Sequence, residues 1–164
     1  MKKSARSLFV RFVSLIVPLA TLTTFTAQTA LAEDFNFPGL SGTVTVTEDQ
    51  YGVPSIRGTS ELDVAFVQGY LHARDRFFQM DYFRKVASGR VAELLGEPGL
   101  SSDIQFRTFG LRRAALKSWQ IADAEMKGRL QAYANGVNTW LSSNPLPPEY
   151  VGLELTKVDP WTPL

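Results

Sequence analysis

The 164-residue chain has no cysteine and only one histidine, His72. Without cysteine it can form no disulfide, no thiol nucleophile and no cysteine-ligated metal site. A serine triad needs a histidine base close to its serine, commonly on a Gly-x-Ser-x-Gly turn, and the chain has no such turn. His72 lies in the middle of an expected helix beside Ala73. We therefore interpret His72 as a structural or surface residue rather than a general base. We expect no residue of this chain to be catalytic.

Several binding motifs are also missing. There is no glycine-rich phosphate loop and no Asp-x-Asp-x-Asp-Gly calcium loop, and a single histidine does not favour zinc. Residues 1–32 hold four basic residues and no acidic one, so residues 33–164 carry 13 basic and 16 acidic side chains. A nucleic-acid surface needs an excess of positive charge. The sequence therefore predicts no nucleic-acid partner, and it identifies no residue that binds a metal or another cofactor.

Residues 1–32 are typical of a secretory signal peptide. Lys2, Lys3, Arg6 and Arg11 precede an uncharged stretch, and Ala30-Leu31-Ala32 is an Ala-x-Ala cleavage motif. The alternative is an uncleaved membrane anchor, but the apolar core is short and a spanning helix needs about 20 apolar residues. We expect cleavage before Glu33 and no membrane association afterwards. The protein would be secreted, to the periplasm or outside the cell, with one domain over residues 33–164.

The first part of that domain is expected to be a β-hairpin. Ser41–Thr47 alternates valine with threonine, a period of two that predicts a strand. The polar stretch to Gly52 suits a turn, and Val53–Arg57 predicts a second short strand. Together with the helices that follow, this hairpin predicts an α+β fold class, a β-hairpin followed by a mostly helical segment.

A long amphipathic helix is predicted from Ser60, its N-cap, to about Ala87. Gly69 lies in its apolar stripe, where we expect another backbone to approach closely. A short helical turn is expected at Val91–Leu95, an irregular helical region at 101–121, a helix at 122–141, and an extended tail beyond Asn144. The stripe of the long helix consists of Leu62, Phe66, Gly69, Ala73, Phe77, Met80, Phe83 and Ala87.

Charged residues gather at the centre of the long helix. Asp75 and Arg76 lie there with Arg74, and Gln79 follows Asp75 at a spacing that permits a hydrogen bond across one turn. The sequence leaves two alternatives open for Asp75 and Arg76. They are either a buried, hydrogen-bonded structural pair or part of an ordinary solvated helix face.

Five blocks of sequence, in order, resemble the amino-terminal part of the penicillin acylase family. The segment from Val46 to Ile56 is similar to the family's opening strand pair, although Ser55 stands where the family usually has histidine, and Arg74 replaces a common glutamine. The blocks are VTEDQYGVPSI at 46–56, QGYLHARDRFFQM at 68–80, ASGRVAELLG at 87–96, LQAYANGVNTWL at 130–141, and the proline-rich stretches LPPEY at 146–150 and DPWTP at 159–163.

The resemblance implies an αββα N-terminal-nucleophile hydrolase fold, of which residues 33–164 would be part of the first, or alpha, chain. It implies a precursor that cuts itself and exposes a serine at the start of a second, or beta, chain. The substrate would be a small N-acyl amide, such as a β-lactam side-chain amide or an acyl-homoserine lactone. The nucleophile, the oxyanion donors and any calcium ligand would lie outside these 164 residues, so we expect no activity from this chain alone.

A second interpretation remains open. The chain could be a non-catalytic exported helical module that binds a partner protein, or an inactive remnant of the family. That interpretation needs no residues beyond those in the sequence, whereas amide hydrolysis requires the second chain as a partner.

Overall fold

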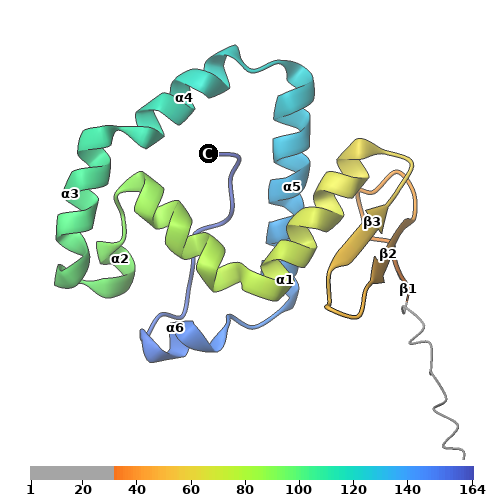
Figure 1. The fold of residues 1–164 in the computed structure, drawn as a ribbon, viewed down its shortest axis with the longest axis horizontal. Helices are drawn as coiled ribbons and strands as arrows, with labels where there is room; N and C mark the ends of the chain where they lie inside the picture. The colour runs from red at the N-terminus through yellow and green to blue at the C-terminus, as the bar shows by residue number, and fades with distance from the viewer. Residues whose placement is uncertain (1–31) are drawn as a thin grey trace, which may run out of the picture.

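A computed structural model describes residues 32–164 of the chain, which form a small sheet followed by helices (Figure 1). The α+β class is therefore confirmed. The elements are β1 (Ala32–Phe35), β2 (Val44–Glu48), β3 (Pro54–Arg57), α1 (Glu61–Ser88), α2 (Ala92–Leu95), η1 (Glu97–Gly99), α3 (Leu100–Phe109), α4 (Leu111–Ile121), α5 (Ala124–Ser143) and α6 (Pro148–Gly152).

The sheet is antiparallel with strand order β1-β2-β3. The predicted hairpin is β2 with β3, in which Val46 faces Ile56. The β1 strand was not predicted, and it pairs with the other edge of β2, where Phe35 faces Val44. Its sequence, AEDF, has too few β-branched residues to indicate a strand by itself. The apolar side of β1 and β2 packs on the first half of α1, burying Phe66, Val67 and Leu71.

Helix α1 begins at the expected N-cap, ends at a glycine and is kinked in the middle. Ser60 accepts a hydrogen bond from the Asp63 amide at 3.4 Å, and Gly89 ends the helix in the left-handed conformation with φ of 64°. Arg76 departs from helical geometry with φ of −154° and ψ of 35°. The first half of α1 packs on the sheet and crosses α5, whereas Ala73 and Phe77, on either side of the kink, pack with residues of α5 and α6.

The crossing of α1 and α5 is very close, because a glycine lies on each side of it. A Cβ atom on Gly69 would lie 2.1 Å from the carbonyl oxygen of Tyr133, and one on Gly136 would lie 1.8 Å from that of Phe66. The expectation that another backbone approaches Gly69 is confirmed. A side chain at either position would push the two helices apart.

The region from α2 to α4 contains more separate helices than predicted. The irregular helical region at 101–121 is two helices, because Gly110 adopts φ of 74° between α3 and α4 and turns the chain. The helix expected at 122–141 is α5, which begins after the cap residue Asp123 and extends to Ser143. The tail predicted to be extended contains the short helix α6, which starts at Pro148, where proline fits the first helical turn.

Helices α1, α3, α4 and α5 follow one another around an arch, and the carboxyl end of the chain lies within it (Figure 1). Among residues 32–164, no helix is both long enough and apolar enough to cross a membrane. The predicted signal peptide falls almost entirely on residues 1–31, which lie outside the described part of the chain.

Candidate functional site

His72 contacts a tyrosine at the crossing of α1 and α5. Its Nδ1 and the hydroxyl of Tyr133 are hydrogen-bonded at 2.9 Å, and the two rings meet edge to face. Burial and the nearby Arg76 guanidinium lower the pKa of His72, because both disfavour the charged imidazolium. The histidine therefore joins two helices, which is the behaviour of a structural residue.

Asp75 and Arg76 are exposed, so the alternative of a buried pair is wrong. Asp75 accepts a hydrogen bond from Arg74 at 2.7 Å, and Arg74 also reaches Glu48 on β2 at 2.6 Å. These two carboxylates raise the pKa of the Arg74 guanidinium. Asp75 makes no hydrogen bond to Gln79, because the non-helical Arg76 lies between them and breaks the regular spacing.

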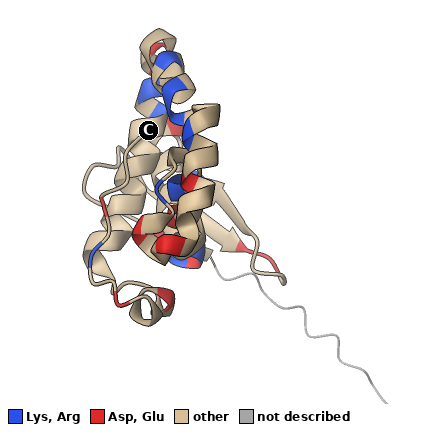
Figure 2. Cartoon of the chain, turned by 90° about the vertical axis from the view of Figure 1, so that its left-hand side faces the viewer, with Lys and Arg blue, Asp and Glu red and all other residues tan. Residues whose placement is uncertain are grey.

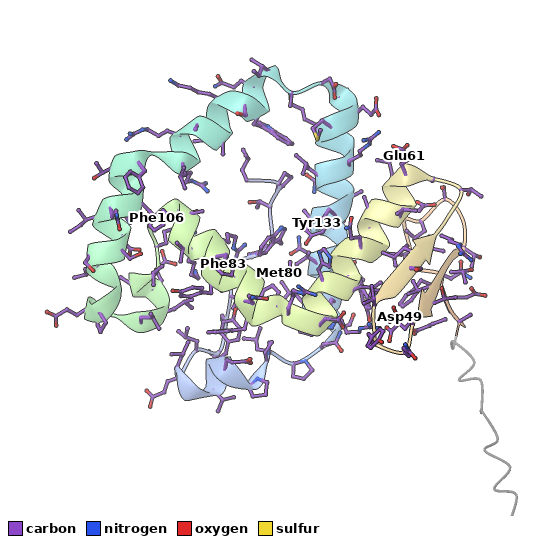
Figure 3. All side chains as sticks on the ribbon, in the orientation of Figure 1. Asp49, Glu61, Met80, Phe83, Phe106 and Tyr133 are labelled. Atoms are coloured by element: carbon purple, nitrogen blue, oxygen red, sulfur yellow. The ribbon has the colours of Figure 1, made fainter. Side chains whose placement is uncertain are left out.

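The kink at Arg76 also redirects the apolar stripe of α1. Phe66, Ala73 and Phe77 are buried as the pattern predicts, but Phe83 is 58% exposed. Beyond the kink the buried positions are taken by Asp81 and Lys85 instead. The second half of the predicted stripe, Met80, Phe83 and Ala87, faces the interior of the arch (Figure 3).

This interior holds an open cavity of about 710 Å³, which we call the inner cavity. It is a mainly apolar space walled by α1, the start of α4, Tyr133 of α5 and the carboxyl-terminal segment. Figure 3 shows Met80, Phe83 and Tyr133 on its inner side. The lining residues are Arg76, Gln79, Met80, Phe83, Arg84, Ala87, Ser88, Leu111, Arg112, Ala115, Tyr133 and residues 161–164.

One wall of the inner cavity is held by Arg84 and Asn138. Arg84 donates to the carbonyl oxygens of Asp159 at 3.2 Å and Pro160 at 3.0 Å, and its guanidinium lies 4.6 Å from the centre of the Trp161 ring. Asn138 donates to the Trp161 carbonyl at 2.8 Å and accepts from the Trp161 amide at 2.7 Å. These contacts fix Trp161 between α1 and α5.

A second group of charges anchors the same segment to α2. Arg90 pairs with Glu93 at 2.6 Å and with Asp159 at 2.6 Å, while Lys85 pairs with Glu93 at 2.9 Å. The hydrogen bonds from Arg90 and Lys85 hold the pKa of Glu93 at about 2, and Arg90 lowers the pKa of Asp159. The segment is thus tied to α1, α2 and α5.

Three buried aspartates were not identified as important in the sequence. Asp63 accepts from the Ser41 hydroxyl at 2.5 Å and from the backbone of Ser41 and Gly42, and these bonds lower its pKa. Asp81, fully buried, accepts from the Tyr150 hydroxyl at 2.8 Å and from Arg84 at 2.5 Å. Burial raises the pKa of Tyr150.

Asp103 accepts from the amides of Val91 at 2.6 Å and Ala92 at 3.0 Å, at the start of α2. Asp63 lies three residues after the N-cap Ser60, a position typical of a capping box. Its carboxylate binds Ser41 instead of the Ser60 amide. Within residues 32–164, no three His, Asp or Glu side chains come together as metal ligands. The geometry therefore supports scaffold roles for these carboxylates.

Comparison with known proteins assigns the family. The family model described as penicillin amidase matches residues 43–164. The penicillin acylase 2 proenzyme of Pseudomonas sp. (strain SE83) is 40% identical over 134 residues, which are 81% of this chain and 17% of that protein. The acyl-homoserine lactone acylase QuiP of Pseudomonas putida is 38% identical over 63% of this chain and 13% of its own length.

The penicillin G acylase of Escherichia coli is 31% identical over 79% of this chain and 15% of its own length. Among solved structures, the thermostable penicillin G acylase from Alcaligenes faecalis matches with a TM-score of 0.66 and 29% identity, covering 73% of this chain and 66% of that chain. The chain thus spans less than a fifth of the length of each of these three relatives, and its fold matches that of the Alcaligenes faecalis structure. The chain belongs to the penicillin amidase family.

Proposed function

We propose that this chain is the amino-terminal, first-chain segment of an exported amidohydrolase of the penicillin acylase type. The complete protein would cleave the amide bond of an N-acyl substrate to give a carboxylic acid and an amine. The observation that carries the proposal is the match of residues 43–164 to the penicillin amidase family. Relatives named as penicillin acylases and as an acyl-homoserine lactone acylase support it.

The proposed nucleophile is a serine that opens a second chain after the precursor is cut. The free α-amino group of that serine would act as its base, since an α-amine titrates near ~8 and is partly neutral at working pH. Donors of the second chain would stabilise the oxyanion. A calcium ion, if the full-length protein binds one, would take ligands outside residues 32–164.

Residues 33–164 would contribute the scaffold. The sheet, the α1–α5 crossing and the anchored Trp161 wall form a framework on which the second chain can assemble. His72 engages Tyr133 in this framework, so it is not placed as a general base. The signal peptide would direct the protein to the periplasm or the extracellular space.

The proposal is tested by comparing the full-length gene product with residues 33–164 expressed alone. Penicillin G and an N-acyl-homoserine lactone serve as probes, and the release of free amine or acid is measured. We expect the full-length protein to cut itself into two chains and to hydrolyse at least one probe, and the isolated segment to hydrolyse neither. The control is the full-length protein with the serine at the start of the second chain changed to alanine, which should be inactive.

Two results would contradict the proposal. Serine-dependent hydrolysis by residues 33–164 would show that the chemistry resides in this segment. A full-length protein that folds but hydrolyses neither probe would favour the inactive remnant or the exported binding module.

A further inference from the structure

Asn135 precedes Gly136 in α5, and this dipeptide favours loss of the asparagine side-chain amide. Asparagine is a thermolabile residue, because the amide nitrogen of the following residue can attack its Cγ atom. A following glycine has no Cβ atom to hinder that approach. The sequence has four asparagines, and the other three precede Phe37, Thr139 and Pro145. Asn135 is therefore the asparagine whose following residue opposes the reaction least.

The reaction needs no reagent except water. The Gly136 amide loses its proton to solvent, its nitrogen bonds to Cγ of Asn135, and the side-chain nitrogen takes up a proton and leaves as ammonia. The product is a succinimide ring, which water opens at either carbonyl to give aspartate or isoaspartate. In isoaspartate the main chain continues through Cβ and Cγ. The net change consumes water, releases ammonia and involves no oxidant or reductant.

In the folded chain the two reacting groups are held apart. Side chains of an α-helix lean toward its amino end. Accordingly, Oδ1 of Asn135 accepts a hydrogen bond at 2.9 Å from Nε2 of Gln131, one turn earlier. The Gly136 amide lies in the interior of α5, where it donates along the helix to a carbonyl oxygen of the preceding turn. Ring closure therefore requires this turn of α5 to unwind.

The α1–α5 crossing opposes that unwinding. Asn135 itself is exposed, so solvent already reaches its side chain. Gly136, in contrast, is buried against α1, and a Cβ atom there would lie 1.8 Å from the Phe66 carbonyl oxygen. Ala134 and Val137 on either side of the dipeptide are fully buried. The backbone at Gly136 can therefore leave the helical conformation only when α1 and α5 separate.

The same stretch of α5 supplies no charged group that could act as an acid or base. Residues 130–148 contain no acidic or basic residue. Basic side chains gather instead on α4, where Arg112, Arg113 and Lys117 lie (Figure 2). The rate of reaction at Asn135 is therefore expected to follow the opening of the backbone.

We propose that Asn135-Gly136 is a deamidation site whose rate is set by the opening of the α1–α5 crossing. A folded chain keeps the site closed. Each opening that leads to the succinimide leaves a permanent covalent change at the closest contact between the two helices. This chemistry belongs to the chain itself and does not depend on the proposed function.

The first test compares the folded full-length protein with the same protein in concentrated urea, at one pH and one temperature. Trypsin should release residues 130–157 as one peptide that contains both Asn135 and Asn138. Mass spectrometry of this peptide measures the loss of each amide, and chromatography separates aspartate from isoaspartate. In urea we expect Asn135 to react about 10-fold or more faster than Asn138, because glycine rather than threonine follows it.

In the folded protein we expect Asn135 to react about 100-fold or more slowly than in urea, because only the open fraction of molecules reacts. Equal rates at Asn135 in the two states would overturn the proposal. So would equal rates at Asn135 and Asn138 in urea, because the dipeptide would then not be a specific site.

Gly69→Ala tests the crossing without denaturant and leaves the dipeptide intact. The added Cβ atom would lie 2.1 Å from the Tyr133 carbonyl oxygen, so the helices must separate. In native buffer we expect this change to accelerate the reaction at Asn135 about 10-fold or more. A variant that fails to fold should react at the rate measured in urea.

The matched control is Gly128→Ala, which lies on α5 outside the close contact. Its Cβ atom would meet only the Leu62 side chain, at 3.6 Å. We expect the rate at Asn135 to stay within about 2-fold of the rate in the unmodified protein, since the crossing is unchanged. Equal rates in the Gly69→Ala and Gly128→Ala proteins would show that the crossing does not control the site.

Discussion

Two buried aspartates bind backbone amides that no secondary structure satisfies. Asp63 joins the start of α1 to the chain before β2, through Ser41 and Gly42. Asp103 binds the amides at the start of α2. Unpaired buried donors are costly, so each carboxylate stabilises a chain segment that has few contacts of its own.

Asp63→Asn should loosen the connection between β2 and α1. An amide retains one acceptor oxygen and loses the charge, whereas the native carboxylate accepts from both amides and the Ser41 hydroxyl. We expect a loss of about 1–3 kcal/mol in protection of the Ser41 and Gly42 amides. Hydrogen exchange measured by mass spectrometry reports this protection.

The matched control is Asp34→Asn, because Asp34 is exposed and accepts a single bond from Thr45 at 2.7 Å. Its effect should stay within about 0.5 kcal/mol. Similar protection in the Asp63→Asn protein and the unmodified protein would show that the carboxylate does not stabilise this junction.

Among the elements, the α1–α5 crossing depends most on residue size. Gly69 and Gly136 each face the backbone of the other helix, with no space for a side chain. The close approach lets Val137 and Trp140 of α5 reach the core formed with Phe77. Helices α1 and α5, which contribute to both core clusters, therefore meet backbone to backbone at Gly69 and Gly136.

Gly136→Ala should therefore destabilise the protein although alanine favours helices. The added Cβ would lie 1.8 Å from the Phe66 carbonyl oxygen, so the helices must separate. We expect a loss of about 3 kcal/mol in the free energy of unfolding, measured by chemical denaturation of the full-length protein.

Gly128→Ala is the control on the same helix. Its Cβ would meet only the Leu62 side chain at 3.6 Å, an ordinary contact. Because alanine is the better helix former, this change should stabilise the helix by up to about 1 kcal/mol. The prediction fails if the two substitutions have the same sign.

The helices show what a periodic pattern can and cannot predict. The pattern located α1 and α5 closely, and it identified Gly69 as a contact point. It placed Phe83 on the same stripe as the core residues Phe66 and Phe77, yet Phe83 is 58% exposed, because periodicity assumes a straight helix and Arg76 interrupts it. No proline or glycine marks this kink, so the sequence carried no signal for it.

At the scale of the whole molecule, the same limit applies to the sheet and the arch. Valine and threonine alternation predicted β2, but β1 exists only because the β2 edge is available to pair with AEDF. The arch depends on Gly110, whose positive φ separates α3 from α4. The predicted hairpin and helices gave the correct α+β class, whereas the inner cavity became visible only in the structure.

Acid should destabilise the whole molecule in two steps. The pKa of His72 is lowered from its ordinary value of 6.5, so its stabilising contribution is complete above pH 6.5 and is lost as the pH falls through its folded pKa. The pKa values of Glu93, about 2 when folded, and of Asp63 and Asp159 are also lowered. The contribution of Glu93 is complete above pH 4.5 and is lost as the pH falls to about 2. The contributions of Asp63 and Asp159 are complete above pH 3.8 and are lost as the pH falls through their lowered pKa values.

The free energy of unfolding, measured by denaturant titration at several pH values, should show both steps. His72→Gln retains a hydrogen-bonding partner for Tyr133 and removes the titration, so it should abolish the upper step alone. An unchanged upper step in this variant would show that another group is responsible for it.

If the protein is exported with the expected signal peptide, strand β1 constrains the order of events. The bond between Ala32 and Glu33 lies within that strand, where Ala32 faces Thr47 and Glu33 faces Val46. Proteolysis acts on a segment that has opened locally, and a strand already paired within a sheet is not open. If the leader is cut before Glu33, cutting therefore precedes pairing, and the cell must keep the amino terminus unfolded until the leader has been removed.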